Sequence, residues 1–213
     1  RCCRPGEAVL LPVRRRRGGR GLLHASVWPG EVVHLAGGSR AQRRQVLAQA
    51  AGLAAPASGR CLLQGRAATG TRWSPAQLGH VLQDDPLPAQ LPVPGFIAAP
   101  LLQQGVPVRS ALLRAELELY LLGACALRQR SAASLQPAEA RLARLARAML
   151  SRPALLVLAW PDDGLPAAQC QALRQALLTL ACTFGSSVLL ATEHPRLQAA
   201  ADRRIDLDRM ADD

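Results

Sequence analysis

The residues with the clearest chemical pattern form a glycine turn between a short apolar stretch and a polar, arginine-rich segment. Residues 32–36 predict a buried strand, Gly37 and Gly38 predict a tight turn, and the segment from Ala41 predicts a helix. A strand, a glycine turn and a helix in this order form the frame of a phosphate-binding loop, in which backbone amides at a helix N-terminus hold an anion. The sequence therefore predicts such a frame, with Gly37, Gly38 and Ser39 in its loop.

The residues that fill this frame depart from the pattern that a phosphate loop needs. In the pattern Gly-x-x-x-x-Gly-Lys-Ser/Thr, starting at Gly37, the positions of the second glycine, the lysine and the hydroxyl hold Gln42, Arg43 and Arg44. Arg43 can still attract an anion, whereas Arg44 cannot ligate a cation and would repel one. We therefore expect no magnesium site here, and we expect any ATP binding to be weak.

The composition is that of a globular chain with an unusual excess of arginine. The 213 residues are 49% hydrophobic, which suffices for one domain, or for one domain with an inserted lobe. All 26 residues of the Lys+Arg class are arginines, and we interpret this as the codon bias of a GC-rich, bacterial genome. The net charge of +11 suits either an anionic partner, such as nucleic acid or a phospholipid surface, or a solvated arginine-rich surface. The codon bias favours the solvated surface.

Neither a membrane span nor a metal-stabilised or disulfide-stabilised fold is expected. No apolar run reaches the roughly 18 to 20 residues that cross a bilayer, and residues 1–7 contain no apolar signal segment. The cysteines have no Cys-x-x-Cys spacing, which suits a reducing cytoplasm; they are Cys2, Cys3, Cys61, Cys125, Cys170 and Cys182.

An α/β fold must position the glycine loop, because short apolar strands alternate with helical segments. Apolar stretches predict strands at residues 8–13, 22–27, 32–36, 61–63, 78–83, 154–160 and 187–192. Leucines at three- and four-residue spacings predict helices between 97 and 150, and a further helix at about 167–183. We expect a mostly parallel sheet like that of P-loop NTPases, with an antiparallel β portion at the N-terminus.

We interpret the whole chain as a single domain. Its core is expected at about residues 1–83 and 152–213, and a helical lobe is expected to be inserted at about 84–151. The boundary lies where a proline-rich connector follows Gln83 and the pattern becomes helical.

The order of these landmarks resembles the ATP-binding subunit of ABC transporters over about nine-tenths of the chain. The resemblance is to the group that serves lipoprotein release, macrolide export and cell division, and it rests on the succession of landmarks. They are the strand and glycine loop at 22–38, Ala51-Gly52-Leu53 with Pro56, Ser58, Gly59 and Gly65, the Q-loop segment 79–84, the lobe entry 98–107, the signature helix 146–153, the Walker B strand 155–161, the switch region 192–195 and the closing strand 201–205.

The positions that carry out hydrolysis in this family mostly hold other residue types. The positions of the Walker B aspartate, the catalytic glutamate and the switch histidine hold Ala159, Trp160 and Glu193. The signature positions hold Leu135-Gln136-Pro137-Ala138-Glu139, and the D-loop aspartate position holds Pro166. By resemblance, a degenerate nucleotide site would consist of Gly37, Gly38, Ser39, Arg43, Arg44 and Gln83, of which Gln83 is the intact Q-loop residue.

These replacements predict a subunit without catalytic residues. Losing a general base or an electrostatic stabiliser lowers a rate by a factor of roughly 10² to 10⁴, and here metal ligands, base, switch and signature are lost together. Two alternatives would restore part of the site. His194 could take the switch role from one position along the chain, and Asp162 or Asp163 could replace the Walker B carboxylate.

The resemblance also implies partners. ATP-binding subunits of this family pair with each other and dock on a membrane permease, so we expect a permease and a second, intact ATP-binding subunit. The expected location is the cytoplasmic face of the inner membrane. The alternatives are a weakly active ABC ATPase and a basic scaffold that binds nucleic acid or another polyanion.

Overall fold

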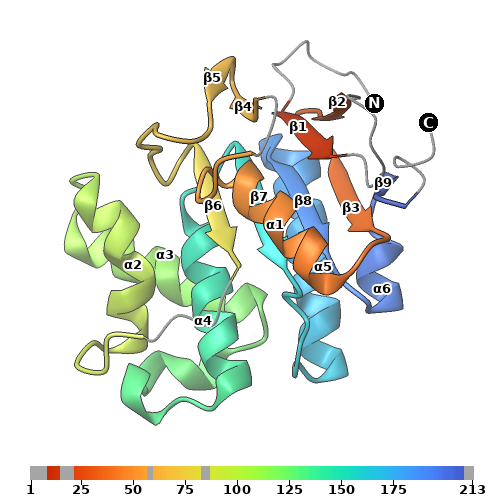
Figure 1. Cartoon of the computed structure of the whole chain (residues 1–213). Helices are drawn as coiled ribbons and strands as arrows, with labels where there is room; N and C mark the ends of the chain where they lie inside the picture. Colours follow the sequence, from red (N-terminus) through yellow and green to blue (C-terminus); the bar gives the residue numbers. More distant parts are fainter. Residues whose placement is uncertain (1–8, 15–21, 57–59, 83–86, 209–213) are drawn as a thin grey trace.

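A parallel sheet forms the centre of the molecule (Figure 1). The computed structural model describes residues 9–14, 22–56, 60–82 and 87–208. The sheet has the strand order β6-β7-β8-β3-β9, with β3 at Val32–Ala36, β6 at Leu78–Val81, β7 at Leu155–Ala159, β8 at Ser187–Ala191 and β9 at Arg203–Asp206. The continuous apolar sequence of β7 agrees with its place between β6 and β8, because such a strand is covered on both faces.

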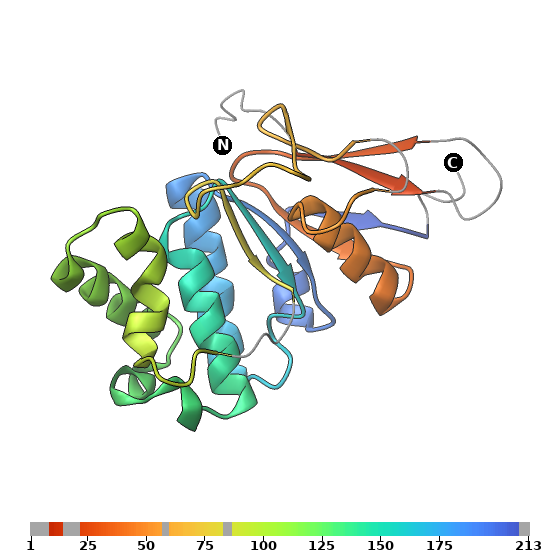
Figure 2. The ribbon, with the colours of Figure 1, turned by 60° about the vertical axis from the view of Figure 1, so that its left-hand side comes forward.

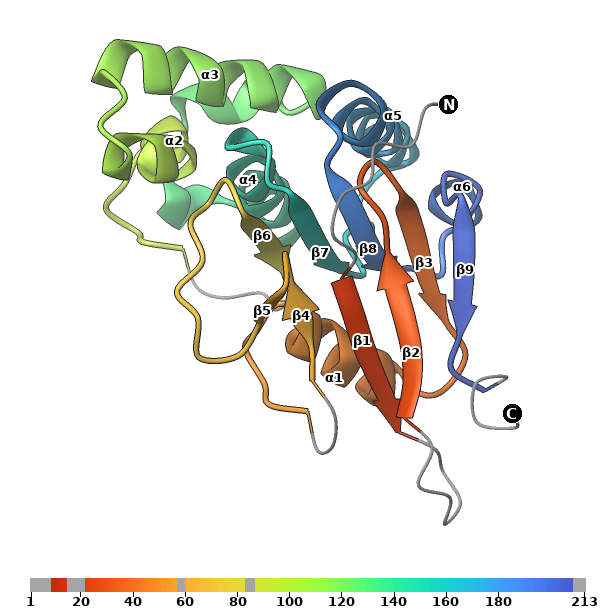
Figure 3. The ribbon, with the colours of Figure 1, turned by 90° about the horizontal axis from the view of Figure 1, so that it is seen from above.

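A smaller antiparallel sheet lies beside the parallel one, as Figure 3 shows from above. Its order is β2-β1-β4-β5, with β1 at Val9–Arg14, β2 at Leu22–Val27, β4 at Leu62–Leu63 and β5 at Arg66–Ala67. Strands β1 and β2 pair in an antiparallel register from Val9 opposite Val27 to Arg14 opposite Leu22. The expected fold class, a mostly parallel sheet with an N-terminal antiparallel portion, is confirmed.

Helices cover both faces of the parallel sheet (Figure 2). Helix α1 (Arg40–Ala50) packs between β1 and the strands β7 and β8. Helices α4 (Pro137–Leu150) and α5 (Ala167–Phe184) cover the opposite face. Side chains of β7 alternate between the two cores: Leu155 and Val157 pack with α1, whereas Leu156 and Leu158 pack with α4 and α5.

The helical lobe consists of α2 (Val93–Gln103), α3 (Val108–Leu121) and α4, with two short 3₁₀ turns at Cys125–Gln129 and Ala132–Ser134. Helix α2 begins four residues before the expected start at Ile97, because Pro92 precedes it and Pro94 suits a first turn. The short helix α6 (Pro195–Gln198) precedes β9. Within the described residues, no helix combines the length and apolar character needed to cross a bilayer.

Candidate nucleotide site

The glycine loop connects β3 to α1, as the sequence predicts. Gly37 and Gly38 adopt φ values of +70° and +59°, a conformation that side-chain-bearing residues rarely take. Helix α1 begins at Arg40, where Ser39 is the N-cap and forms a capping box with Gln42. The helix therefore includes the family position of the second glycine, and Ser39 caps it from within the loop.

Side chains of the protein already bind several amides of this loop. The Gly38 amide donates to Asp208 Oδ2 at 2.8 Å, and the Ser39 amide donates to Gln42 Oε1 at 2.7 Å. A side chain at Gly37 would meet Asp206 Oδ1 at 2.1 Å, so this carboxylate lies directly against the loop. Two carboxylates, Asp206 at the end of β9 and Asp208 just after it, thus lie where a phosphate loop holds its anion. Phosphate would have to displace Asp208 and would be repelled by both.

The arginines at the start of α1 form ion pairs with the replaced functional positions. Arg43, at the lysine position, contacts Glu193, at the switch position, with 3.1 Å between Nη2 and Oε1. Arg40 Nη2 contacts Asp163 Oδ2 at 2.7 Å, and its Nε lies 3.7 Å from Glu193 Oε1. Only 14% of the Arg43 side chain is exposed. Glu193 therefore balances the positive charge that a nucleotide phosphate would otherwise meet.

Trp160 fills the end of β7, where the family places its catalytic glutamate. The residue is 4% exposed, adopts φ of +45° and donates its amide to the Ala191 carbonyl at 2.8 Å. Guanidinium carbons of Arg40, Arg43 and Arg44 lie 4.4, 5.6 and 5.8 Å from the centre of its ring. These are cation–π contacts. An indole surrounded by guanidinium groups can neither take a proton from water nor ligate a metal.

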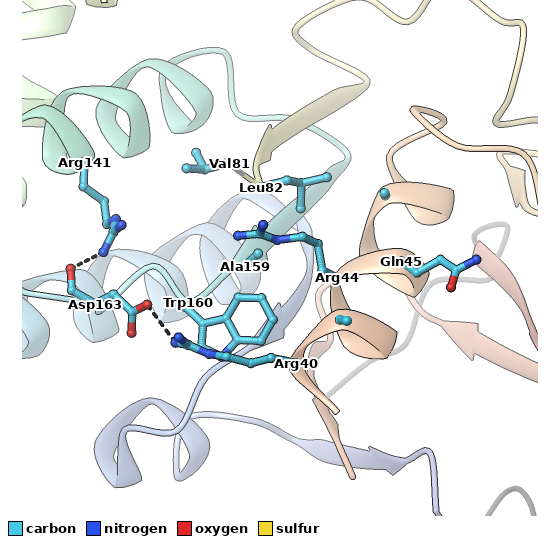
Figure 4. A pocket seen from close by; sticks show the side chains of 11 residues that line it. Arg40, Arg44, Gln45, Val81, Leu82, Arg141, Ala159, Trp160 and Asp163 are labelled. Carbon is cyan, nitrogen blue, oxygen red and sulfur yellow. Dashed lines mark hydrogen bonds and ion pairs between the residues drawn. The ribbon is translucent and has the colours of Figure 1, made fainter. Parts of the chain in front are cut away.

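A pocket of about 530 Å³ opens beside Trp160 (Figure 4). Its walls come from α1, the end of β6, the end of β7 and α4; the lining residues are Arg40, Ala41, Arg44, Gln45, Ala48, Val81, Leu82, Arg141, Ala159, Trp160 and Asp163. The structure therefore brings Arg44, Ala159 and Trp160 to one pocket. Gln83 follows Leu82 in the sequence but lies outside the described residues.

The groups that could substitute for the lost functional residues have other contacts. Asp162 Oδ1 accepts a hydrogen bond from Thr192 Oγ1 at 2.6 Å, and Asp163 pairs with Arg40. His194 Nδ1 accepts a hydrogen bond from the Arg196 amide at 3.2 Å and so caps α6. Among the described residues, no group of three or more His, Cys, Asp or Glu side chains is placed to hold a metal ion. These contacts favour structural roles for all three residues.

The signature positions also have a structural role in this chain. Glu139 Oε2 accepts a hydrogen bond from the backbone amide of Gln136 at 2.8 Å. Its Oε1 forms an ion pair with Arg130 Nη1, also at 2.8 Å. Pro137 is the first residue of α4, where the absence of a backbone N–H has no cost because the first N–H groups of a helix have no partner within the helix. The segment that resembles the signature therefore stabilises the start of a helix, and its backbone is restricted where the family has glycine.

His34 is a buried residue that the sequence reasoning did not single out. Its Nε2 donates to the Thr192 carbonyl at 3.1 Å and so ties β3 to the switch region. Burial lowers the pKa of His34, and the charges of Arg204 and Arg43 lower it further. The imidazole is therefore neutral near pH 7, and we assign it a structural role. The carboxylates Asp206 and Asp208 were missed because only the tertiary fold brings them to the glycine loop.

Known proteins with similar sequences and folds identify the family. No family model matches the chain. It is 30% identical over 207 residues to the lipoprotein-releasing system ATP-binding protein LolD 2 of Caulobacter vibrioides, covering 94% of this chain and 88% of that protein. It is 31% identical over 207 residues to the cytochrome c biogenesis ATP-binding export protein CcmA of Bordetella parapertussis, covering 92% and 87%.

The fold matches solved structures of ATP-binding cassettes. The ATP-binding cassette MJ0796, in a dimeric post-hydrolysis state bound to ADP and Pi, superposes with a TM-score of 0.81 over 94% of each chain at 17% identity. CbiO1 of Clostridium perfringens, part of an ABC transporter complex, superposes with a TM-score of 0.70 over 95% of this chain and 86% of its own, at 16% identity. Sequence and fold thus agree with the order of landmarks: the chain belongs to the ATP-binding subunits of ABC transporters.

Proposed function

We propose that this chain is a catalytically degenerate ATP-binding subunit, which keeps the fold and the permease-facing surface of its family but does not hydrolyse ATP. The observation that carries the proposal is Trp160, buried among three arginines at the position of the catalytic glutamate. The occupied glycine-loop amides and the Arg43–Glu193 pair support it independently. The residues at the family's metal-ligand, catalytic-base and switch positions all differ from those that hydrolysis needs. No plausible combination of the remaining groups therefore sustains ordinary ATP turnover.

The proposed partners follow from the family. Such a subunit would dock on a membrane permease at the inner face of the membrane and pair with an intact ATP-binding subunit, which would supply hydrolysis for the complex. The scaffold alternative, binding of nucleic acid or another polyanion, loses support because Arg40 and Arg43 pair with carboxylates of the chain itself. The salt dependence of binding distinguishes the two functions. Binding to the phosphates of a nucleic acid weakens steeply as the salt concentration rises, whereas docking on a permease through apolar contacts does not.

Purified chain should show no magnesium-dependent ATPase activity above background. The physical reason is that Arg44 repels the cation, Ala159 cannot ligate it and Trp160 cannot act as a base. Phosphate release should be measured with and without Mg²⁺, beside an intact ABC ATPase subunit purified in the same way. Turnover of the same order as that subunit would refute the proposal and favour the weakly active ATPase.

Docking should depend on the groove between the sheet core and the helical lobe. This groove of about 450 Å³ is lined by Leu53, Trp73, Leu87, Phe96 and others, among them Pro100 of the lobe entry. Leu53 is 58% exposed there, so Leu53→Asp places a charge in the groove without disturbing the core. We expect this variant to lose co-purification with the membrane subunit while melting at the wild-type temperature.

The matched control is Leu113→Asp, because Leu113 is also an exposed leucine, at 67%, but lies on α3 and does not line the groove. It should co-purify with membrane protein like the wild type. If Leu53→Asp retains the complex, or if both variants lose it equally, the docking surface lies elsewhere.

A further inference from the structure

Helix α3 lies at the outer edge of the helical lobe. Figure 3 shows it on the far side of α4 from the strands β6 and β7. The inner face of α3 includes Ala111, Ala115 and Leu119, which are fully buried against α2 and α4. A surface helix of a globular protein is usually polar on the opposite face. The outer face of α3 is apolar instead.

This outer face carries four large apolar side chains, here called the α3 stripe. They are Leu113 (67% exposed), Leu117 (52%), Tyr120 (68%) and Leu121 (42%). Residues three or four positions apart are neighbours on the surface of a helix, so the four side chains form one continuous patch. Among the described residues, the large exposed apolar side chains are thus concentrated on α3. A continuous apolar patch of this kind marks a contact with another molecule or with a membrane.

Arginines flank the α3 stripe on both sides. Each residue of a helix is turned by about 100° from the previous one, which places Arg109 on one side of the stripe and Arg114 on the other. Both side chains are exposed. The carboxylates of α3 do not cancel their charge, because Glu116 pairs with Arg128 at 3.6 Å and Glu118 is buried. The outer face of α3 therefore presents leucine and tyrosine between two positive charges.

This combination suits the surface of an anionic membrane. Leucine and tyrosine side chains can enter the boundary between lipid headgroups and acyl chains, while arginine side chains reach the lipid phosphates. The net charge of the protein is +11, and anionic lipids attract such a chain. A second copy of the chain suits the face less well. A two-fold axis that pairs the stripes would set each arginine flank beside the same flank of the other copy.

We propose that the α3 stripe binds directly to the surface of a bilayer that contains anionic phospholipid. The four apolar side chains insert among the headgroups, and Arg109 and Arg114 contact lipid phosphates from the two sides of the stripe. This inference goes beyond the proposed function and is independent of it, because the contact requires no permease and no nucleotide.

Sedimentation of the whole chain with protein-free vesicles tests the proposal. Vesicles of phosphatidylglycerol and phosphatidylethanolamine should bind the chain, and vesicles of phosphatidylcholine should bind it much more weakly. Leu113→Asp/Leu117→Asp should weaken binding by about a hundredfold or more, because two apolar side chains are lost and two negative charges face the lipid. Leu113→Ser/Leu117→Ser adds no charge and should still weaken binding by about tenfold or more. Both positions are exposed, so these variants should melt at the wild-type temperature.

Matched controls separate the α3 stripe from the rest of the surface. Leu53→Asp changes an exposed leucine outside α3 and should bind vesicles like the wild type. Arg109→Ser/Arg114→Ser should weaken binding by about tenfold or more. Arg66→Ser/Arg72→Ser removes the same charge from exposed positions outside α3, and it should have a much smaller effect.

Three results would overturn the proposal. They are equal losses in the two arginine variants, wild-type binding by the double serine variant of the stripe, and no binding of the wild type to anionic vesicles. A dimer in lipid-free solution that Leu113→Asp/Leu117→Asp dissociates would also overturn it, because a second copy would then cover the stripe. Co-purification with the permease in detergent tests docking separately, because no bilayer is present there.

Discussion

Replacing Arg152 by alanine should lower the free energy of unfolding by about 3 to 5 kcal/mol, the cost typical of breaking a buried ion pair. The partner of Arg152 is Glu118 on α3, whose side chain is 2% exposed. Arg152 follows α4, also donates to the Met149 carbonyl at 3.1 Å, and stacks on Phe184 of α5. Arg152 therefore contacts three helices, and it contacts α3 through the Glu118 carboxylate. Its removal leaves that carboxylate buried with no partner among the described residues, because Glu118 Oε2 already has none.

The loss should depend on pH in a defined direction. Burial raises the pKa of Glu118, while the hydrogen bond and charge of Arg152 lower it. Without Arg152 only the burial remains, so the pKa in the folded state rises further above that in the unfolded chain. A raised pKa means that the folded state binds the proton more tightly. Stability of the variant should therefore be greatest below the unfolded pKa of the carboxyl group and fall as the pH rises through the folded pKa.

Chemical denaturation of Arg152→Ala from pH 5 to pH 8 would measure both effects. The matched control is Arg128→Ala, because Arg128 pairs with Glu116 of the same helix at 3.6 Å but with side chains 55% and 36% exposed. Such a pair contributes about 0 to 1 kcal/mol. Adding Glu118→Gln to Arg152→Ala should restore part of the stability and remove the pH dependence. A loss no larger than that of the control would mean that Glu118 is protonated and tolerated.

Much of the fold could be predicted because local patterns determine it. The apolar run between Pro153 and Pro161 predicts a buried strand, and β7 lies inside the parallel sheet, between β6 and β8. The sequence predicts a helix that starts near Ala41, and α1 starts at Arg40, where Ser39 and Gln42 have the spacing of a capping box. The strand predicted at residues 78–83 was too long at its end, because β6 ends at Val81.

The contacts of the site could not be predicted in the same way. The sequence indicates that Trp160 replaces the catalytic glutamate, but not that Arg40, Arg43 and Arg44 surround its ring, because α1 and β7 are more than a hundred residues apart. Likewise, Asp208 reaches Gly38 only because β9 pairs with β3 in parallel. Local periodicity carries no information about such pairings, whereas the order of landmarks identifies the family and hence the topology.

Restoring the two lost carboxylates, with Ala159→Asp and Trp160→Glu, should leave the chain without ATPase activity. Gln42 still replaces a glycine within the first turn of α1, and Arg44 still repels magnesium. The double variant should also lose roughly 1 to 4 kcal/mol of stability. From the sequence alone, the expected cause of this loss is that two new carboxylates enter an apolar strand end where no cation pairs with them. The structure corrects the cause, because three arginines can pair with the new carboxylate at position 160.

The expected loss therefore comes mainly from the missing indole, and single variants can separate packing from charge. Trp160→Ala removes the ring and adds no charge, so it should cost about 3 to 5 kcal/mol, more than Trp160→Glu, whose carboxylate recovers part through the arginines. Thermal melting of both variants and of the double variant, with and without magnesium-ATP, gives the comparison. If the double variant is strongly stabilised by magnesium-ATP, a working nucleotide site persists beneath Trp160. The degeneration would then be confined to two residues, whereas the occupied glycine loop and the Arg43–Glu193 pair indicate that it extends through the whole site.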